Sequence, residues 1–175
     1  MRRTILLSVV TLLLAVSAAA QETPRAEIFG GYSYARLNPG GLAGNEMNLN
    51  GWHAAVQGNV TSWFGVVGDF SGHYGTRAGA DINSHQALFG PRLTFRGPVS
   101  PFAHALFGFA RGNAGLFGST DSETAFGMAL GGGFDINLGS DRVAWRLIQA
   151  DYLMTRFFDG TRNNARLSTG IVFRF

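Results

Sequence analysis

The final nine residues, 167–175, constrain the fold of this chain more than any other segment. Apolar and polar residues alternate along them. One face of an extended strand would carry Leu167, Thr169, Ile171, Phe173 and Phe175, and the other Ser168, Gly170 and Arg174, with Val172 as an apolar exception. Period-two alternation predicts a strand with one apolar and one polar face. The apolar face must then be covered, either by a protein core or by lipid.

The first twenty residues have the pattern of a secretory signal peptide. Arg2 and Arg3 form a positive start, residues 5–16 are almost entirely apolar, and three alanines at 18–20 precede Gln21. The apolar run is short for a membrane-spanning helix, which needs about 20 residues, so a cleaved leader is favoured over an anchor. We therefore predict a signal peptide over 1–20, cleaved near Ala20. Because no later segment is apolar enough for a spanning helix, the exported chain is either a soluble protein or an outer-membrane barrel.

Composition narrows this choice. Charged residues make up only 14% of the chain, whereas a soluble protein typically has about 25%. Cysteine is absent, which excludes a disulfide framework. All fourteen basic residues are arginine, and two of them belong to the predicted leader, so twelve arginines face eleven acidic residues in the mature chain. That balance, together with the absence of any basic run, argues against a nucleic-acid partner.

The mature sequence divides into eight alternating segments separated by turn-forming residues. The predicted strands cover 27–37, 49–60, 63–74, 82–96, 102–111, 124–138, 142–157 and 165–175. Each is about ten residues or longer, as a tilted transmembrane strand requires. The connections alternate between short turns, near Ser62, Pro98 and Ser140, and longer loops after the first, third, fifth and seventh strands. A barrel with both termini in the periplasm predicts this asymmetry.

Two of the segments disturb the alternation. Pro91 lacks an N–H group and would remove one ladder hydrogen bond from the fourth segment, where a bulge is a reasonable expectation. In the seventh segment Arg146, Gln149 and Asp151 cannot all face inward in a regular strand. Either Arg146 lies outside near the lipid headgroups, or a bulge shifts the phase of the strand.

This eight-segment plan resembles the small eight-stranded outer-membrane β-barrel families, the outer-membrane protein A-like and X-like barrels. The resemblance covers 21–175 and rests on Gly30-Gly31-Tyr32-Ser33-Tyr34, Gly131-Gly132-Gly133-Phe134-Asp135-Ile136, Gln149-Ala150-Asp151-Tyr152 and the closing Phe173-Arg174-Phe175. It implies an all-β, eight-stranded antiparallel up-and-down transmembrane barrel, placed in the outer membrane as a monomer among outer-membrane lipids. It also implies that Ile171, Phe173 and Phe175 form a C-terminal signal read by the barrel assembly machinery. Some members of these families carry a periplasmic peptidoglycan-binding domain after the barrel, and we do not expect one here.

The polar face of the predicted strands carries charged residues. These are Glu27, Asp69, Arg92, Asp135, Asp151, Arg166 and Arg174. An eight-stranded barrel is just wide enough inside for side chains, so these charges must pair with one another. We predict a charged, plugged interior rather than a conducting path.

Neither a metal site nor a catalytic site is predicted. His53, His73, His85 and His104 are scattered over four segments, where interior or rim positions explain them better than metal ligation. The close Ser–His pairs, Ser84–His85 and Ser71–His73, lie outside any elbow or triad motif. No cofactor is expected, because the glycine run at 131–133 lacks the lysine and helix of a phosphate loop.

Bulky aromatic residues on the apolar faces fit the interfacial girdles of a membrane barrel. They are Tyr32, Tyr34, Trp52, Trp63, Phe64, Phe95 and Phe175. A soluble ligand-binding barrel of the lipocalin type is the alternative, but charged and small residues occupy one face of most strands. The sequence thus predicts a non-enzymatic outer-membrane barrel contributing to membrane integrity or surface contact. A narrow or gated passage for small solutes is the alternative function, and a lipid-modifying enzyme comes third.

Overall fold

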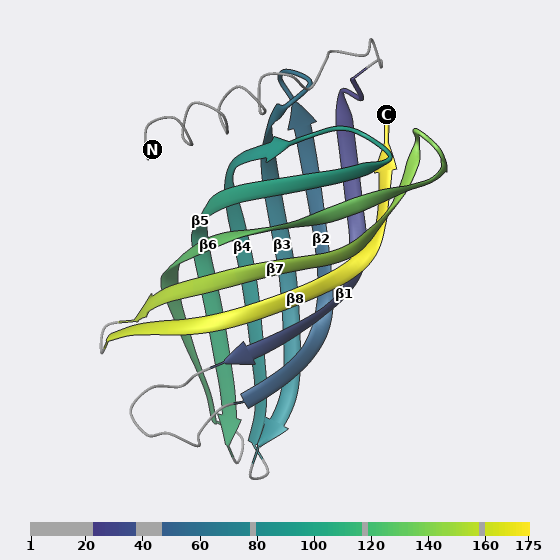
Figure 1. Ribbon diagram of the computed structural model, residues 1–175. Helices are drawn as coiled ribbons and strands as arrows, with labels where there is room; N and C mark the ends of the chain where they lie inside the picture. The colour runs from purple at the N-terminus through teal and green to yellow at the C-terminus, as the bar shows by residue number, and fades with distance from the viewer. Residues whose placement is uncertain (1–22, 38–46, 78–79, 117–118, 158–159) are drawn as a thin grey trace, which may run out of the picture.

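The computed structural model describes residues 23–37, 47–77, 80–116, 119–157 and 160–175, and shows a closed antiparallel barrel of eight strands (Figure 1). In chain order these are β1 (Ala26–Leu37), β2 (Met47–Asn59), β3 (Phe64–Arg77), β4 (Ala80–Thr94), β5 (Val99–Leu116), β6 (Ser119–Ser140), β7 (Val143–Phe157) and β8 (Gly160–Arg174). The predicted fold is confirmed. In the described part of the chain, no helix has the length and apolar character needed to cross a membrane. The predicted leader, 1–20, lies outside the described residues.

The last strand closes the barrel against the first. Ten residue pairs join β1 to β8, from Glu27 opposite Arg174 to Arg36 opposite Ala165. Beyond the ladder, the Arg25 amide donates to the Phe175 carbonyl at 2.6 Å, and the Phe175 amide donates to the Ala26 carbonyl at 2.9 Å. Since every strand has two neighbours, the wall of the barrel has no free edge where lipid would meet unpaired backbone groups.

Both described ends of the chain and the short turns lie at one end of the barrel. Backbone hydrogen bonds link them into a rim: the Thr94 amide donates to Trp63, the Asn137 amide to Pro98, and the Arg174 amide to Arg142. In the β6–β7 turn Gly139 has a φ of 71°, a conformation that favours glycine. Short turns mark the periplasmic end of outer-membrane barrels, so we refer to this rim as the periplasmic rim.

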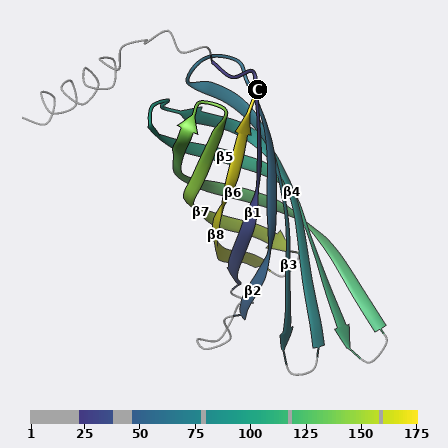
Figure 2. The same cartoon turned by 90° about the vertical axis from the view of Figure 1, so that its right-hand side faces the viewer.

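The strands at the opposite end are longer than the sequence predicts. Residues predicted as loops, 75–81, 112–123 and 158–164, mostly continue the β3–β4, β5–β6 and β7–β8 hairpins. The β3–β4 and β5–β6 hairpins extend beyond the ends of β1 and β2 (Figure 2). Their Gly, Ser, Asn and Thr content is typical of loops, but a ladder started in the barrel wall continues as long as each new pair adds backbone hydrogen bonds.

The interruption at Pro91 does not shift the strand register. The β4–β5 ladder skips from Phe89–Phe107 to Arg92–His104, and the residue pairing is the same on both sides of the gap. On the other side Pro91 pairs with Val66 without irregularity. The expected bulge is therefore not formed: the proline only removes a hydrogen bond locally, in a wall that is held by its neighbouring strands.

A bulge does occur in β7, at Leu147 and Ile148. Phe134 pairs with Ile148, but the next residue of β6, Asp135, pairs with Arg146. Leu147 is thus an extra residue, and both bulged residues face outward, with exposures of 43% and 42%. The bulge shifts the phase of the strand so that Arg146 and Gln149 both face inward, each 1% exposed. A position of Arg146 outside, near the headgroups, is therefore wrong.

Candidate functional site

The barrel interior is the part of the structure where polar chemistry is concentrated. All seven charged residues expected there lie inside, and each is at most 7% exposed. Arg146, brought in by the bulge, joins them. Among the described residues the buried carboxylates are then Glu27, Asp69, Asp135 and Asp151, and the buried guanidinium groups are Arg92, Arg146, Arg166 and Arg174. Four negative charges meet four positive charges, as burial in a narrow barrel requires.

Arg166 on β8 forms the centre of the first cluster. Its Nη1 donates to Oδ1 of Asp69 at 2.8 Å, and its Nε donates to Oδ2 of Asp151 at 2.9 Å. Each carboxylate also binds a histidine: Nε2 of His53 lies 2.6 Å from Asp69, and Nε2 of His104 lies 2.8 Å from Asp151. Arg166 therefore joins strands on opposite sides of the barrel through two carboxylates, and its own exposure is 0%.

Asp135 on β6 forms the centre of the second cluster. Nε and Nη2 of Arg146 donate to its two oxygens at 2.8 and 3.1 Å, and Nη2 of Arg92 lies 3.3 Å away. The Arg146 guanidinium lies between the rings of Phe29 and Phe102, 4.3 and 4.5 Å from their centroids. Such cation–π packing satisfies the flat faces of a guanidinium whose edges are hydrogen-bonded.

Gln149 links the two clusters. Its Oε1 accepts from Nη1 of Arg146 at 2.8 Å, and its Nε2 donates to Oδ2 of Asp151 at 2.8 Å. Hydrogen bonds thus run without interruption from Arg92, through β6, β7 and β8, to Asp69 on β3. We call this chain of side chains the interior network; its members are Arg92, Asp135, Arg146, Gln149, Asp151, Arg166 and Asp69. Period-two alternation alone does not predict this network, because Arg146 and Gln149 both face inward only through the bulge in β7.

Glu27 forms a separate cluster near the periplasmic rim. Its Oε1 accepts from Nη2 of Arg96 at 2.6 Å and from Nδ2 of Asn59 at 2.9 Å. Its Oε2 lies 3.4 Å from Nε of Arg174, whose Nη1 donates to Oδ1 of Asn137 at 2.6 Å. Arg96, absent from the sequence prediction, is the closest partner of Glu27. Arg96 ends the predicted strand 82–96, and the alternation that places Arg92 on the inward face places Arg96 there too, so the pattern could have included it.

Apolar side chains fill the rest of the interior. A contiguous cluster of buried residues draws on all eight strands: Phe29, Ala55, Val67, Leu88, Leu106, Ala129, Ala144, Leu153 and Val172. Val172, the apolar exception on the polar face of the last strand, is one of these residues and is 0% exposed. The interior is therefore packed by ion pairs and small apolar groups together, which is the packing expected of eight strands.

The histidine and serine residues considered for catalysis are placed as follows. Ser71 accepts a hydrogen bond from Arg166 at 3.0 Å, whereas His73 lies 2.9 Å from the hydroxyl of Ser33. His85 is on the outer surface, where its ring packs edge-on against Tyr74. In the part of the chain that the structure describes, no three His, Asp or Glu side chains are grouped as metal ligands would be.

The expected girdle aromatics all lie on the outer surface. Tyr32, Trp52, Trp63, Phe95 and Phe175 are 43–68% exposed, and Tyr34 and Phe64 are partly exposed. In the expected C-terminal signal, Phe173 and Phe175 are exposed on the outside, at 49% and 68%, and Ile171 is partly covered. The outer surface therefore presents aromatic and aliphatic residues to the surroundings, the reverse of a soluble barrel.

Comparison with known proteins identifies the family. The model of the outer membrane protein beta-barrel domain family matches residues 6–175. The chain belongs to this family. It is an outer-membrane protein, and its exposed apolar face is the face that meets lipid. No curated protein sequence matches the chain.

Solved structures show the same fold. Neisserial surface protein A superposes with a TM-score of 0.73 at 14% identity, over 86% of this chain and 97% of that chain. Ail, the attachment invasion locus protein of Yersinia pestis, gives 0.60 at 20% identity, over 86% and 99%. The N-terminal β-barrel domain of Pseudomonas aeruginosa OprF gives 0.57 at 11% identity, over 87% and 98%. At these identities the similarity is one of architecture.

Proposed function

We propose that this protein is a non-enzymatic outer-membrane barrel that makes contacts at the cell surface through the sheet formed by the outer ends of β3, β4, β5 and β6. The observation that carries the proposal is the difference in strand length. The β5–β6 ladder extends to Leu116 opposite Ser119, whereas β6 and β7 pair only from Phe126 opposite Arg156. The outer end of β6 is thus bonded on one side alone, and an edge of this kind can pair with another polypeptide.

The packed interior supports a structural role for the barrel itself. The interior network crosses the barrel from Arg92 to Asp69, and the buried apolar cluster occupies the space beside it. Moving a solute past these side chains would require breaking several ion pairs in surroundings of low dielectric. In planar lipid bilayers we therefore expect no lasting conductance steps from the purified protein. Steps that persist in the wild type would favour the passage of small solutes instead.

The positions of the Asp–His pairs argue against a lipid-modifying enzyme. His53 and His104, which bind Asp69 and Asp151, are 1% and 5% exposed. A lipid substrate approaches from the outer surface or the rim, and these pairs face the closed interior. Lipid A composition should therefore be identical in cells with and without the gene, and a modified lipid A that depends on the gene would overturn this assignment.

Surface contact and membrane integrity can be separated by shortening the β5–β6 hairpin. Replacing residues 114–121 with Asn-Gly retains the Asn113–Ser122 pair and closes it with a two-residue turn. In a deletion strain this variant should restore resistance to detergents, because the barrel wall is intact, but not attachment of cells to protein-coated surfaces. A variant shortened in the β7–β8 hairpin, with residues 156–161 replaced by Asn-Gly next to the Thr155–Arg162 pair, leaves the β3–β6 sheet unchanged and serves as the control. Full attachment by the 114–121 variant would contradict the contact role.

The fold shared with Ail covers the whole barrel. Attachment is a property of Ail, and whether this chain also attaches cells is part of what the hairpin variant tests. We further propose that the chain is a monomer, and that Ile171, Phe173 and Phe175 are read by the assembly machinery. The outward direction of Phe173 and Phe175 supports this role, because an assembly factor would meet them before β8 closes on β1.

A further inference from the structure

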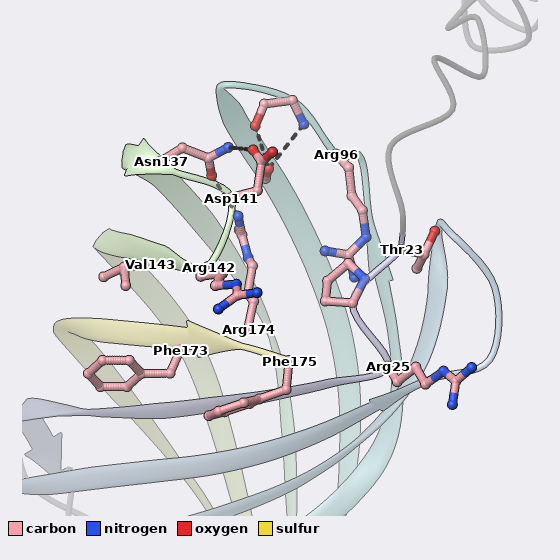
Figure 3. Close-up of a pocket in the computed structure, with 13 residues that line it drawn as sticks. Thr23, Arg25, Arg96, Asn137, Asp141, Arg142, Val143, Phe173, Arg174 and Phe175 are labelled. Atoms are coloured by element: carbon pink, nitrogen blue, oxygen red, sulfur yellow. Dashed lines mark hydrogen bonds between the residues drawn. The ribbon is translucent and has the colours of Figure 1, made fainter.

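A cavity opens at the periplasmic rim, beside β8 and the β6–β7 turn (Figure 3). Its lining is of two kinds. One part is charged and polar and the other is apolar: Arg25, Arg96, Asn137, Asp141, Arg142 and Arg174 form the first, and Val143, Phe173 and Phe175 the second. The cavity therefore touches both the charged mouth of the barrel and its lipid-facing surface.

Arg174 contributes a buried hydrogen-bond donor to this cavity. The residue is 7% exposed, and its Nε and Nη1 are directed to Glu27 and Asn137. Its Nη2 is also buried and has no hydrogen-bond partner among the described residues. Burying a guanidinium N–H without an acceptor costs free energy, and an acceptor on a group bound in the cavity would recover it.

Two carboxylates neighbour the site, and the buried one, Glu27, is already paired with arginine. Glu27 accepts from Arg96 at 2.6 Å and from Asn59 at 2.9 Å, and Asp141 lies 3.4 Å from Nδ2 of Asn137. The second cation at the site, Arg142, is exposed in the β6–β7 turn. Its carbonyl accepts from the Arg174 amide at 2.8 Å, which fixes the turn beside β8. Arg142 and Arg174 are thus neighbours along the backbone of the rim, and both line the cavity.

The apolar part of the cavity is on the outer surface of β7 and β8. Val143 pairs with Phe173 across β7 and β8, and Phe173 is 49% exposed. Because side chains alternate along a strand, Phe173 faces lipid while the next residue, Arg174, faces the mouth. A ligand that fills both parts must have an anionic group at one end and an apolar chain at the other.

We propose that this rim binds an anionic phospholipid of the inner leaflet, with its phosphate held by Arg142 and Arg174 and its acyl chains along Val143 and Phe173. The forked donors of arginine match the oxygens of a phosphate, and charge-assisted hydrogen bonds are the strong ones. The level of the site also fits, since the periplasmic turns of an outer-membrane barrel lie at the headgroups of that leaflet. The site is at the opposite end of the barrel from the β3–β6 sheet and is independent of it.

Lipid retention tests the proposal. The full-length protein is placed in nanodiscs of equal parts phosphatidylglycerol and phosphatidylcholine. Native mass spectrometry then counts the lipids that stay bound when the protein is released from the nanodisc. The wild type should retain phosphatidylglycerol with a preference of about tenfold, the value of one net charge-assisted hydrogen bond. Equal retention of the two lipids would overturn the proposal.

Variants separate the site from the general charge of the protein. Arg142→Gln changes an exposed turn residue and should abolish the preference without affecting folding, and Arg174→Gln should do the same where it folds. Arg36→Gln, which removes one exposed charge at the other end of β1, should keep the preference. A retained preference in Arg142→Gln would overturn the proposal. Displacement of the bound lipid by millimolar inorganic phosphate would also overturn it, in favour of a site for free phosphate.

Discussion

The two faces of the barrel wall obey different rules, although the same strands form both. On β6, Leu130 and Phe134 face lipid with exposures of 58% and 48%, while their neighbours Ala129 and Asp135 are fully buried inside. The outer face needs only apolar side chains, because lipid adapts to their shape. The inner face needs each charge to have its partner at a fixed place, because nothing in the packed interior can replace a missing one.

Removing the bulge tests both faces at once and should have the largest effect. Deletion of Leu147 would turn Arg146 toward lipid and take it away from Asp135. An arginine in lipid and a broken buried pair together should destabilise the barrel by at least about 5 kcal/mol. We expect no folded protein, measured as loss of the difference in SDS-gel migration between boiled and unboiled samples. Leu147→Ala keeps the bulge and should fold. A folded deletion variant would show that the bulge at Leu147 does not determine which residues of β7 face inward.

Removal of Arg166 tests the inner face alone. Arg166→Met leaves Asp69 and Asp151 without their common cation, which should lower the free energy of unfolding by about 3–5 kcal/mol in urea titrations in lipid vesicles. The triple variant that also carries Asp69→Asn and Asp151→Asn removes the unpaired charges and should recover most of this loss. If the single and triple variants are equally stable, the ion pairs do not hold the interior together.

Leu130→Arg tests the outer face alone. It should destabilise the folded protein in bilayers by about 2–4 kcal/mol, because an arginine near the middle of the bilayer loses its hydration. The matched variant Leu130→Ala removes the same side chain without adding a charge and should have a clearly smaller effect. Similar values for the two variants, from the same urea titrations, would show that Leu130 is not in contact with the lipid core.

Deletion of Phe175 should have the smallest effect on equilibrium stability. Only about a third of this residue is covered by protein, so the lost side-chain burial should cost about 1 kcal/mol, beside the backbone hydrogen bonds to Arg25 and Ala26, and refolding into detergent should succeed. In cells we expect a kinetic defect, with the variant accumulating in the periplasm or being degraded. Fractionation and immunoblotting measure this, and wild-type levels in the outer membrane would exclude a role of Phe175 in assembly.

The sequence alone determined the barrel and the direction of most side chains. Period-two alternation is a local property, so residues such as Asp69, Leu130 and Arg166 could be assigned to a face without knowing their neighbours. The number of strands followed from the turn residues, and the lipid-facing side followed from composition. The limits of the hairpins did not follow, because whether polar residues such as 119–123 pair depends on the ladder below them.

Only the tertiary structure decided which charges meet. Asp69 and Arg166 are 97 residues apart in sequence, and their contact arises because β3 and β8, which do not pair with each other, point side chains into one narrow interior. The direction of Arg146 depends on a bulge, which exists only relative to the register of β6 and β8. Alternation fixes the face of a residue within its own strand, whereas register, closure and bulges are relations between strands, and these select the partners.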